Sequence, residues 1–232
     1  MSERYWALVP AAGVGSRMGS RRPKQYLELL GRRVIDHTLQ RLLGHPRIER
    51  LYLVLSSNDG YWAECEYASD PRVVRVTGGD ERCHSVLNAL RELRAEADPD
   101  DWVLVHDAAR PCLSEDDLDR LIERLAGHPV GGLLGVPVQD TLKRVSSQGK
   151  VRATVPRGNL WQAYTPQMFR LGLLTQALEQ ALRLGELVTD DAGAMELAGH
   201  TPLMVEGHAG NIKITRPADL SLAAFYLSRE TL

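Results

Sequence analysis

Short apolar runs alternate along the chain with segments whose apolar residues recur at helical spacing. Tyr5–Val9 and Leu51–Leu55 are continuous apolar runs, the pattern of strands that are buried on both faces. Val34–Leu43 lies between them and has the spacing of an amphipathic helix, as does Glu81–Arg94 further along. Strands that alternate with helices in this way predict an α/β fold, with a doubly wound, mostly parallel sheet covered by helices on both faces.

The same patterns predict the other elements of the core. Further strands are expected at Val73–Val76, Trp102–Val105, Gly132–Val136, Leu203–Val205 and Asn211–Ile214. Further helices are expected after Ser114, at Leu171–Leu184, at Asp190–Leu197 and from Pro217 onward. Ser114 is a suitable N-cap because its hydroxyl can accept a backbone N–H of the first turn, and three acidic residues follow it at the positive end of the helix dipole. Gly185 is expected to end the helix that precedes it.

Residues 137–157 break the alternation because polar residues dominate there. Ser146–Gly149 has the composition of a turn, and it separates two short alternating segments, Leu142–Val145 and Val151–Val155. This arrangement predicts a β-hairpin arm that projects from the core, with a plain surface loop as the alternative. The core then consists of residues 1–136 and 158–232.

Candidate chemistry begins directly after the first predicted strand, at Pro10–Gly19. Glycines and small residues there allow backbone N–H groups to approach an anion closely. The dinucleotide fingerprint fails because Met18 stands where it requires glycine, and no Gly-Lys-Ser/Thr of a Walker loop follows. A turn that serves only the fold is the alternative interpretation.

Basic residues crowd the chain in and after this loop. They are Arg17, Arg21, Arg22, Lys24, Arg32 and Arg33, with Glu28 as the only acid in their segment. The whole chain has 28 Lys and Arg against 30 Asp and Glu, a net charge of −2, so this clustering is local. It suggests a polyanion such as a nucleoside triphosphate, which carries about four negative charges. A solvated basic loop is the alternative.

Composition also excludes several classes of protein. The net charge of −2 argues against non-specific binding of nucleic acid or of anionic membranes. No apolar run approaches the ~20 residues of a membrane span, and the first residues lack the pattern of a signal peptide. Cys65, Cys83 and Cys112 are far apart, which is typical of free thiols in a reducing cytosol. We therefore expect a cytoplasmic protein.

Polar residues follow several predicted strands, at the edge where open α/β sheets bind ligands. Gly79 and Asp80 follow the third strand, with Ser85 just inside the next helix, and Asp107 and Arg110 follow the fourth. The carboxylate and the guanidinium could bind hydroxyls and a phosphate, or could simply pair with each other. His106 beside them is a lone histidine at a strand end, which is more often a structural residue than a catalyst. None of the seven histidines has metal-ligand spacing. Arg157 at the base of the predicted arm and Lys213 in a late predicted strand are two more cations beside small polar residues. Thr141, Thr165 and Thr189 lie in similar positions at the edges of predicted loops.

Together these residues resemble the 2-C-methyl-D-erythritol 4-phosphate cytidylyltransferase family of the non-mevalonate isoprenoid pathway. The matching stretches are Pro10–Gly19, Arg22–Leu27, Gly78–Asp80 with Arg82 and Ser85, His106–Pro111, Pro137 with Asp140 and Thr141, Thr154–Val155 with Arg157, Leu160–Ala163, Thr165–Gln167, Thr189–Ala192 and Asn211–Pro217. The first loop alone would also suit sugar-phosphate nucleotidyltransferases, whereas the whole series is much more specific. Two departures from the family pattern are Pro156 and Gly210.

The resemblance implies a Rossmann-like fold, Mg²⁺ bound mainly through CTP phosphates, and a homodimer in which the β-arm embraces the partner. The implied reaction transfers CMP from CTP to methylerythritol phosphate and releases pyrophosphate. Arg17 and Lys24 would stabilise the transition state, while Lys213 and the partner-delivered Arg157 would position the acceptor. Other acceptor contacts would be Asp107, Arg110, Thr141, Thr165 and Thr189. The nucleotide would bind to Pro10, Ala11, Ala12, Gly13, Gly15, Gly79, Asp80, Ser85 and Ala108.

Two other functions stay open at this point. An NAD(P)-dependent oxidoreductase could use a similar sheet, but Met18 and the absence of an acid at Ser56–Asn58 weaken it. A non-catalytic nucleotide-binding regulator is the second, and the retained Arg17, Lys24 and Lys213 argue against it. The chain ends soon after its last predicted helix, so we expect no second enzyme of the pathway fused to it.

Overall fold

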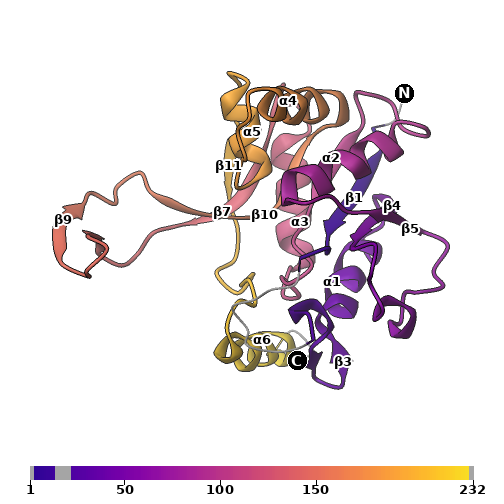
Figure 1. Ribbon diagram of the computed structural model, residues 1–232, viewed down its shortest axis with the longest axis horizontal. Coiled ribbons are helices and arrows are strands. Elements are labelled where there is room, and N and C mark those ends of the chain that lie inside the picture. The colour runs from indigo at the N-terminus through magenta and orange to yellow at the C-terminus, as the bar shows by residue number, and fades with distance from the viewer. Residues whose placement is uncertain (1–2, 14–21, 230–232) are drawn as a thin grey trace.

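A seven-stranded sheet is the frame of the protein in the computed structural model, which describes residues 3–13 and 22–229 (Figure 1). Its strands are β1 (Tyr5–Pro10), β4 (Ile48–Leu55), β5 (Val73–Thr77), β6 (Trp102–Val105), β7 (Gly131–Pro137), β10 (Trp161–Arg170) and β11 (Leu203–Glu206). They lie in the order β11-β7-β10-β6-β1-β4-β5. Strand β10 is antiparallel to both of its neighbours, and the other pairs are parallel. The predicted mostly parallel sheet is confirmed.

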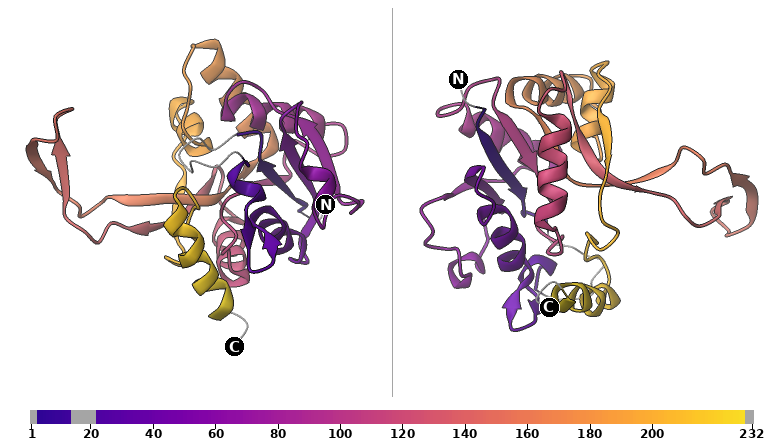
Figure 2. Two further views of the ribbon diagram at one scale, coloured as in Figure 1. Left: turned by 60° about the horizontal axis from the view of Figure 1, so that its bottom comes forward. Right: turned by 180° about the vertical axis from the view of Figure 1, so that it is seen from behind.

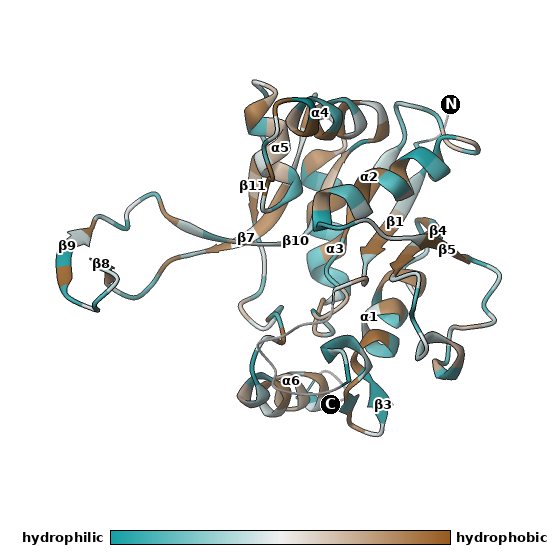
Figure 3. Ribbon diagram, in the orientation of Figure 1, coloured by the Kyte–Doolittle hydropathy of each residue, from teal (hydrophilic) through white to brown (hydrophobic). Residues whose placement is uncertain are grey.

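Helices cover both faces of this sheet. They are α1 (Val34–Leu43), α2 (Arg82–Leu93), α3 (Glu115–Leu125), α4 (Leu171–Arg183) and α5 (Asp191–Leu197). A further helix, α6 (Pro217–Arg229), packs against β2 and the loop after β6 instead. Helices α2, α4 and α5 lie on the face seen in Figure 1, and α3 lies on the opposite face, which Figure 2 (right) turns toward the viewer. Helices α1, α2 and α3 show both apolar and polar parts in Figure 3, as a helix between sheet and solvent requires.

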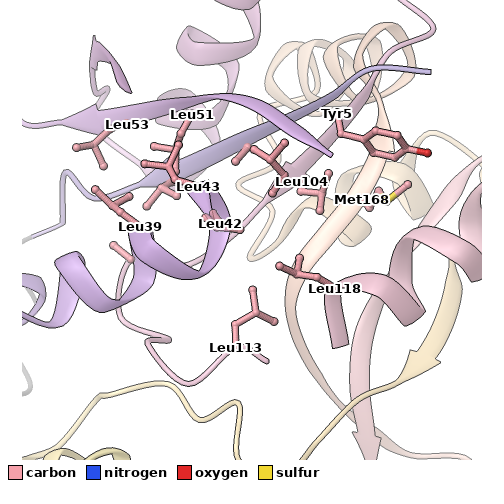
Figure 4. Packing of buried hydrophobic residues seen from close by; sticks show 14 of the residues in the cluster. Tyr5, Leu39, Leu42, Leu43, Leu51, Leu53, Leu104, Leu113, Leu118 and Met168 are labelled. Atoms are coloured by element: carbon pink, nitrogen blue, oxygen red, sulfur yellow. The ribbon is translucent and has the colours of Figure 1, made fainter. Parts of the chain in front are cut away.

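The central strand β1 contributes to both layers of the core. Tyr5, Ala7 and Val9 pack with the leucines of α1 and α3, whereas Trp6 and Leu8 pack with α2 and α4. This division follows from the two-residue period of a strand, which sends alternate side chains to opposite faces. Figure 4 shows the first of these clusters, where side chains of α1 meet those of the sheet.

Most of the predicted boundaries are confirmed. The Ser114 hydroxyl accepts a hydrogen bond from the backbone N–H of Asp117, so it caps α3 as expected. Gly185 adopts a φ of +73° just after α4, a left-handed conformation that favours glycine at a helix end.

The three cysteines are free and buried. No helix in the described part of the chain is long and apolar enough to cross a membrane.

One predicted strand was wrong, and one observed strand was missed. Asn211–Ile214 is not a strand, because its backbone pairs with a loop instead: the N–H of Ile214 donates to the carbonyl of Ala109 at 2.8 Å. Strand β10 was not predicted at all. Pro166 lies within it and supplies no N–H, and the pairing with β7 shifts register between Ala163 and Gln167. Pairing with β6 and β7 makes this segment a strand although Pro166 disfavours one locally.

The predicted strands of the arm are present as β8 (Leu142–Val145) and β9 (Val151–Val155), which pair antiparallel. Figure 1 shows them far from the helical layers, at the end of a ribbon that continues β7 and β10. Val145 and Val151 expose 53% and 63% of their surface there. The remaining elements are short and precede or follow α1: β2 (Glu28–Leu29), β3 (Arg32–Arg33) and the single turns η2 (Lys24–Tyr26) and η3 (Trp62–Glu64).

Candidate active site

A cavity of about 290 Å³ opens at the carboxyl ends of β1 and β6. The strand order reverses at this point, because the chain continues from β1 to β4 on one side and later returns to β6 on the other. Ligands of open α/β sheets bind at such a switch point. The cavity is lined by Pro10, Ala11, Ala12, Gly13, Lys24, Gln25, Gly79, Asp80, Glu81, Arg82, Ser85, Asp107, Ala108, Ala109 and Lys213.

The structure gathers most of the predicted site residues around this cavity. Every predicted nucleotide-binding residue that is described lines it, and so do Lys24, Asp107 and Lys213. Arg17 and Gly15 lie outside the described residues. The roles assigned to individual residues stay predictions.

Close contacts explain the small residues where the loops after β1 and β5 meet at the cavity. A Cβ on Gly78 would lie 2.6 Å from the Cβ of Ala12, and one on Gly79 would lie 2.5 Å from the Cβ of His84. The N–H of Gly79 donates to the Ser85 hydroxyl at 3.1 Å. Larger residues would therefore push the loops apart, and only glycine permits this approach.

Two side chains from η2 connect the glycine-rich loop to the rest of the site. The Gln25 amide donates to the carbonyls of Ala11 and Gly13, at 2.7 and 3.2 Å. The ammonium group of Lys24 donates to the carbonyl of Ile214 at 2.9 Å. This contact holds a cation beside the segment that carries Lys213, although 190 residues separate Lys24 from Ile214. The two predicted lysines thus converge on one cavity.

Asp107 is the centre of the charges on the opposite wall. Its Oδ2 lies 2.9 Å from Nζ of Lys213 and 3.3 Å from Nε of Arg110, and its Oδ1 lies 3.8 Å from Nε of Arg82. Burial alone would raise the pKa of Asp107, but the three cations outweigh it and hold the pKa well below its usual range. The carboxylate is therefore ionised at neutral pH.

A buried hydrogen-bond network supports Asp107 from behind. The Thr165 hydroxyl accepts from the N–H of Asp107 at 3.0 Å and lies 2.9 Å from Nδ1 of His106. Nε2 of His106 lies 3.0 Å from the Arg110 carbonyl, and burial lowers the pKa of His106 to about 4. A neutral ring that donates through Nε2 and accepts the Thr165 hydroxyl proton at Nδ1 satisfies every contact. His106 is thus a structural residue.

Several residues expected to contact the acceptor do not line the cavity of this chain. Thr165 and Arg110 are buried behind Asp107, and Arg110 donates to the carbonyl of Asn211 at 2.7 Å. Thr141, Arg157 and Thr189 are exposed. Arg157 donates to a carbonyl within the arm, that of Gln139.

The cavity also contains residues for which sequence analysis predicted no role. Gln25 and Arg82 line it, and both belong to the motifs on which the family resemblance rests. The two partners of Arg82, Asp107 and Asp191, lie far away in sequence, so no local pattern could have marked Arg82 as a site residue. Among residues 3–13 and 22–229, no group of three or more His, Cys, Asp or Glu is placed to hold a metal ion.

The sheet and its glycine-lined, lysine-bearing cavity define an α/β protein of the Rossmann-like class that is built to bind a phosphorylated ligand. Comparison with known proteins specifies it further. The family model of 2-C-methyl-D-erythritol 4-phosphate cytidylyltransferase matches residues 5–229, and the chain belongs to this family.

Individual relatives agree with this assignment. A 2-C-methyl-D-erythritol 4-phosphate cytidylyltransferase from Pseudomonas fluorescens (strain Pf0-1) is 57% identical over 217 residues, 93% of this chain and 92% of the relative. One from Vibrio vulnificus is 52% identical and covers 97% of this chain and 94% of its own length. A crystal structure of 4-diphosphocytidyl-2C-methyl-D-erythritol synthase superposes with a TM-score of 0.85 at 38% identity, covering 97% of this chain and all of that one.

Proposed function

We propose that this protein transfers CMP from CTP to 2-C-methyl-D-erythritol 4-phosphate, releases pyrophosphate and forms 4-diphosphocytidyl-2-C-methyl-D-erythritol for isoprenoid biosynthesis. Membership of the cytidylyltransferase family supports this reaction. The single observation that carries it in the structure is the convergence of Lys24, Lys213 and the glycine-lined loops on one cavity. Neither the oxidoreductase nor the non-catalytic regulator has comparable support.

The reaction needs no general base. A phosphate oxygen of the acceptor is already ionised at neutral pH and attacks the α-phosphorus of CTP in line. The new P–O bond forms as the bond to the β-phosphate oxygen breaks, and the electron pair leaves with pyrophosphate. His106 is neutral and both of its ring nitrogens are occupied, so it does not take part in proton transfer. The main obstacle is repulsion between two anions.

Cationic side chains lower that repulsion. Lys24, together with Arg17, stabilises the charge that develops on the α-phosphate in the transition state. Lys213 positions the acceptor phosphate: its side chain is 40% exposed, and it pairs with Asp107 at the cavity wall, where a phosphate can replace the carboxylate as its partner. Removing water from around these groups strengthens each contact.

The two substrates share the cavity. The nucleotide contacts the glycine-rich loop, Gly79, Asp80, Ser85 and Ala108, where closely packed backbone leaves room for a flat base and a ribose. The acceptor lies toward Asp107, which accepts hydrogen bonds from its hydroxyl groups. Thr141, Thr165, Thr189 and Arg110 complete its surroundings, directly or through Asp107.

Mg²⁺ bound mainly through the phosphates of CTP would neutralise part of the triphosphate charge. The Asp107 carboxylate at the cavity wall already faces three cationic side chains, which leaves the triphosphate oxygens as the main ligands of such an ion. Mg²⁺ commonly binds in this way, with few protein ligands and several retained waters.

The arm mediates homodimer formation in this proposal. Its strands leave Leu142, Val145 and Val151 exposed, and an arm that extends away from its own body needs a second surface to cover them (Figure 1). Arg157 at the base of the arm then reaches the acceptor site of the partner. The free, buried cysteines fit a cytoplasmic location.

The decisive experiment is an assay of the purified protein with CTP, methylerythritol phosphate and MgCl₂. We expect pyrophosphate release that requires both substrates, with the cytidylyl product identified by mass spectrometry. Reactions with ATP, GTP or UTP in place of CTP serve as controls. Hydride transfer with a nicotinamide cofactor, or tight CTP binding without turnover, would favour one of the alternatives. Sedimentation analysis of the same preparation tests the dimer.

A further inference from the structure

Arg82 forms a two-point ion pair across the cavity wall. It is the first residue of α2, and its guanidinium donates from Nη1 and Nη2 to the two carboxylate oxygens of Asp191, at 3.1 and 2.7 Å. The Asp191 side chain has no exposed surface, whereas that of Arg82 is 25% exposed and lines the cavity. Two parallel hydrogen bonds between planar groups fix orientation as well as distance. The pair therefore joins α2 rigidly to the start of α5.

The start of α5 is the end of an exposed segment. Thr189 precedes Asp191 by two residues and is exposed, as are residues 183–187 before it. A second anchor comes from β10, where the Gln167 amide donates to Asp190 at 2.9 Å and accepts from the N–H of Ala192 at 2.8 Å. Gln167 thus holds the segment from the sheet, and Arg82 holds it from the cavity.

Arg82 also faces the carboxylate on the acceptor side of the cavity. Its Nε lies 3.8 Å from Oδ1 of Asp107, so one guanidinium lies between Asp107 and Asp191. Burial alone would lower the pKa of Arg82, but the charge of Asp191 and then that of Asp107 raise it above its ordinary value. Loss of Arg82 would leave Asp191 as a buried, uncompensated charge.

We propose that Arg82 is a positioning residue that sets the geometry of the acceptor site, through Asp191 for the segment of Thr189 and directly for Asp107. The inference rests on the proposed function, because the acceptor is taken to be methylerythritol phosphate. Arg82 stands next to the nucleotide-side residues Gly79 and Asp80, yet its partners belong to the other side. It couples the two halves of the site.

Asp191→Asn is the sharpest test, because Asp191 is buried beneath Arg82 and does not itself line the cavity. The variant keeps the size of the side chain and loses the charge that fixes the guanidinium. We expect KM for methylerythritol phosphate to rise about tenfold or more, since small displacements of a binding group have large kinetic effects. KM for CTP should stay within about twofold. Arg82→Lys, which keeps the charge but not the fork, should shift the same constant in the same direction.

Arg91→Gln is the matched control. Arg91 also belongs to α2 and pairs with Glu179 of α4 at 3.2 Å, but its side chain is 56% exposed and lies outside the cavity. This variant should keep both KM values. If Asp191→Asn leaves KM for the acceptor unchanged, or changes both constants equally, the inference is wrong. A change in KM for CTP alone would assign Arg82 to the nucleotide instead, and would also overturn it.

Hydrogen exchange separates this inference from the proposed function. In Asp191→Asn and Arg82→Lys, amides of residues 185–194 should exchange at least about tenfold faster than in the wild type, while those of β6 keep their rates. This readout needs no turnover. An inactive wild-type protein with the expected exchange would reject the proposed reaction only. An active protein whose variants exchange like the wild type would reject the positioning role only.

Discussion

The inner wall of the cavity and the arm are built in opposite ways. In this wall and directly behind it, Asp107, His106 and Arg110 expose 8%, 0% and 7% of their surface, and each is held by partners from β10 or from the segment before α6. On the arm, Thr141 and Arg157 are exposed, and Val145 and Val151 are more than half exposed. One chain completes the wall, whereas the arm presents apolar side chains that a second surface can cover.

This contrast shows that the side chains of the wall are held in place by the fold of their own chain, whereas those of the arm are not. Groups on the wall are oriented before any substrate arrives, so they need no reorganisation during the reaction. Breaking such a buried charge network by removing one partner has a cost of about 3–5 kcal/mol. Substitutions on an exposed arm usually change the free energy of unfolding by no more than about 0.5 kcal/mol. The exposed side chains of the arm therefore add little to the stability of their own chain.

The largest expected effect is the loss of kcat when Lys24, a cation at the cavity, is removed. Lys24→Ala should lower kcat about 10²–10³-fold, because an ammonium held at the cavity stabilises charge in the transition state. KM for CTP should change much less. Steady-state kinetics measures both constants, with Lys150→Ala at the exposed turn of the arm as the control. A kcat near that of the wild type would show that the role assigned to Lys24 is wrong.

The next prediction concerns the pH dependence of the wall. Burial lowers the pKa of His106 from 6.5 in the unfolded chain to about 4, so between these values the unfolded state binds more protons than the folded state. The free energy of unfolding should therefore fall as pH decreases from 6.5 to 4, by about 3 kcal/mol from this residue. Its stabilising effect is fully present above pH 6.5. Asp107, whose pKa is also lowered, acts only at more acidic pH.

Urea denaturation of the wild type and of His106→Gln between pH 4 and 7.5 measures this dependence. His37 is buried with a lowered pKa and contributes a slope of the same sign in both proteins, so the difference between the two curves isolates His106. The variant should be less stable at pH 7.5 but flatter below pH 6.5. Parallel curves would contradict a neutral, buried His106.

A third prediction tests whether the arm acts in another subunit. Arg157→Ala should lower kcat/KM for methylerythritol phosphate about 10²-fold without changing the melting temperature, because Arg157 is exposed in its own chain. Mixing Arg157→Ala with Lys24→Ala subunits should restore activity, since each mixed dimer then has one intact site. Verified mixed dimers without recovered activity would rule out exchange of the arm.

The smallest effect is expected at the tip of the arm. Val151→Ser should leave the free energy of unfolding of the monomer within about 0.5 kcal/mol of the wild type, while weakening self-association by about 1 kcal/mol. Dilution series in the ultracentrifuge measure the association. Leu39→Ala in the core provides the contrast, with an expected loss of about 2–5 kcal/mol in stability. An unchanged association constant would show that Val151 does not contribute to a dimer interface.

Much of the site was predictable because parallel strands place their carboxyl ends at one edge. Gly79 and Asp107 follow different strands, yet both were expected at that edge and both line the cavity. Pairing of Asp107 with its neighbour Arg110 was one of the expected alternatives, but its partners from distant segments were not predictable in this way. Lys213 was expected on a strand, and it belongs instead to an irregular segment that pairs with the loop after β6. Only the packing of that segment brings its ammonium to the carboxylate.

The sequence by itself determined those elements that depend only on residues close together in the chain. Helical spacing predicted α1 at its observed residues, and alternation around a turn predicted β8 and β9. Tertiary structure alone decided that β10 runs antiparallel between two buried strands, and that Arg82 meets a carboxylate 109 residues away. Periodicity and turn composition act over a few residues of chain. Strand pairing and the neutralisation of buried charge depend on which distant segments fold against each other, and no local pattern records that choice.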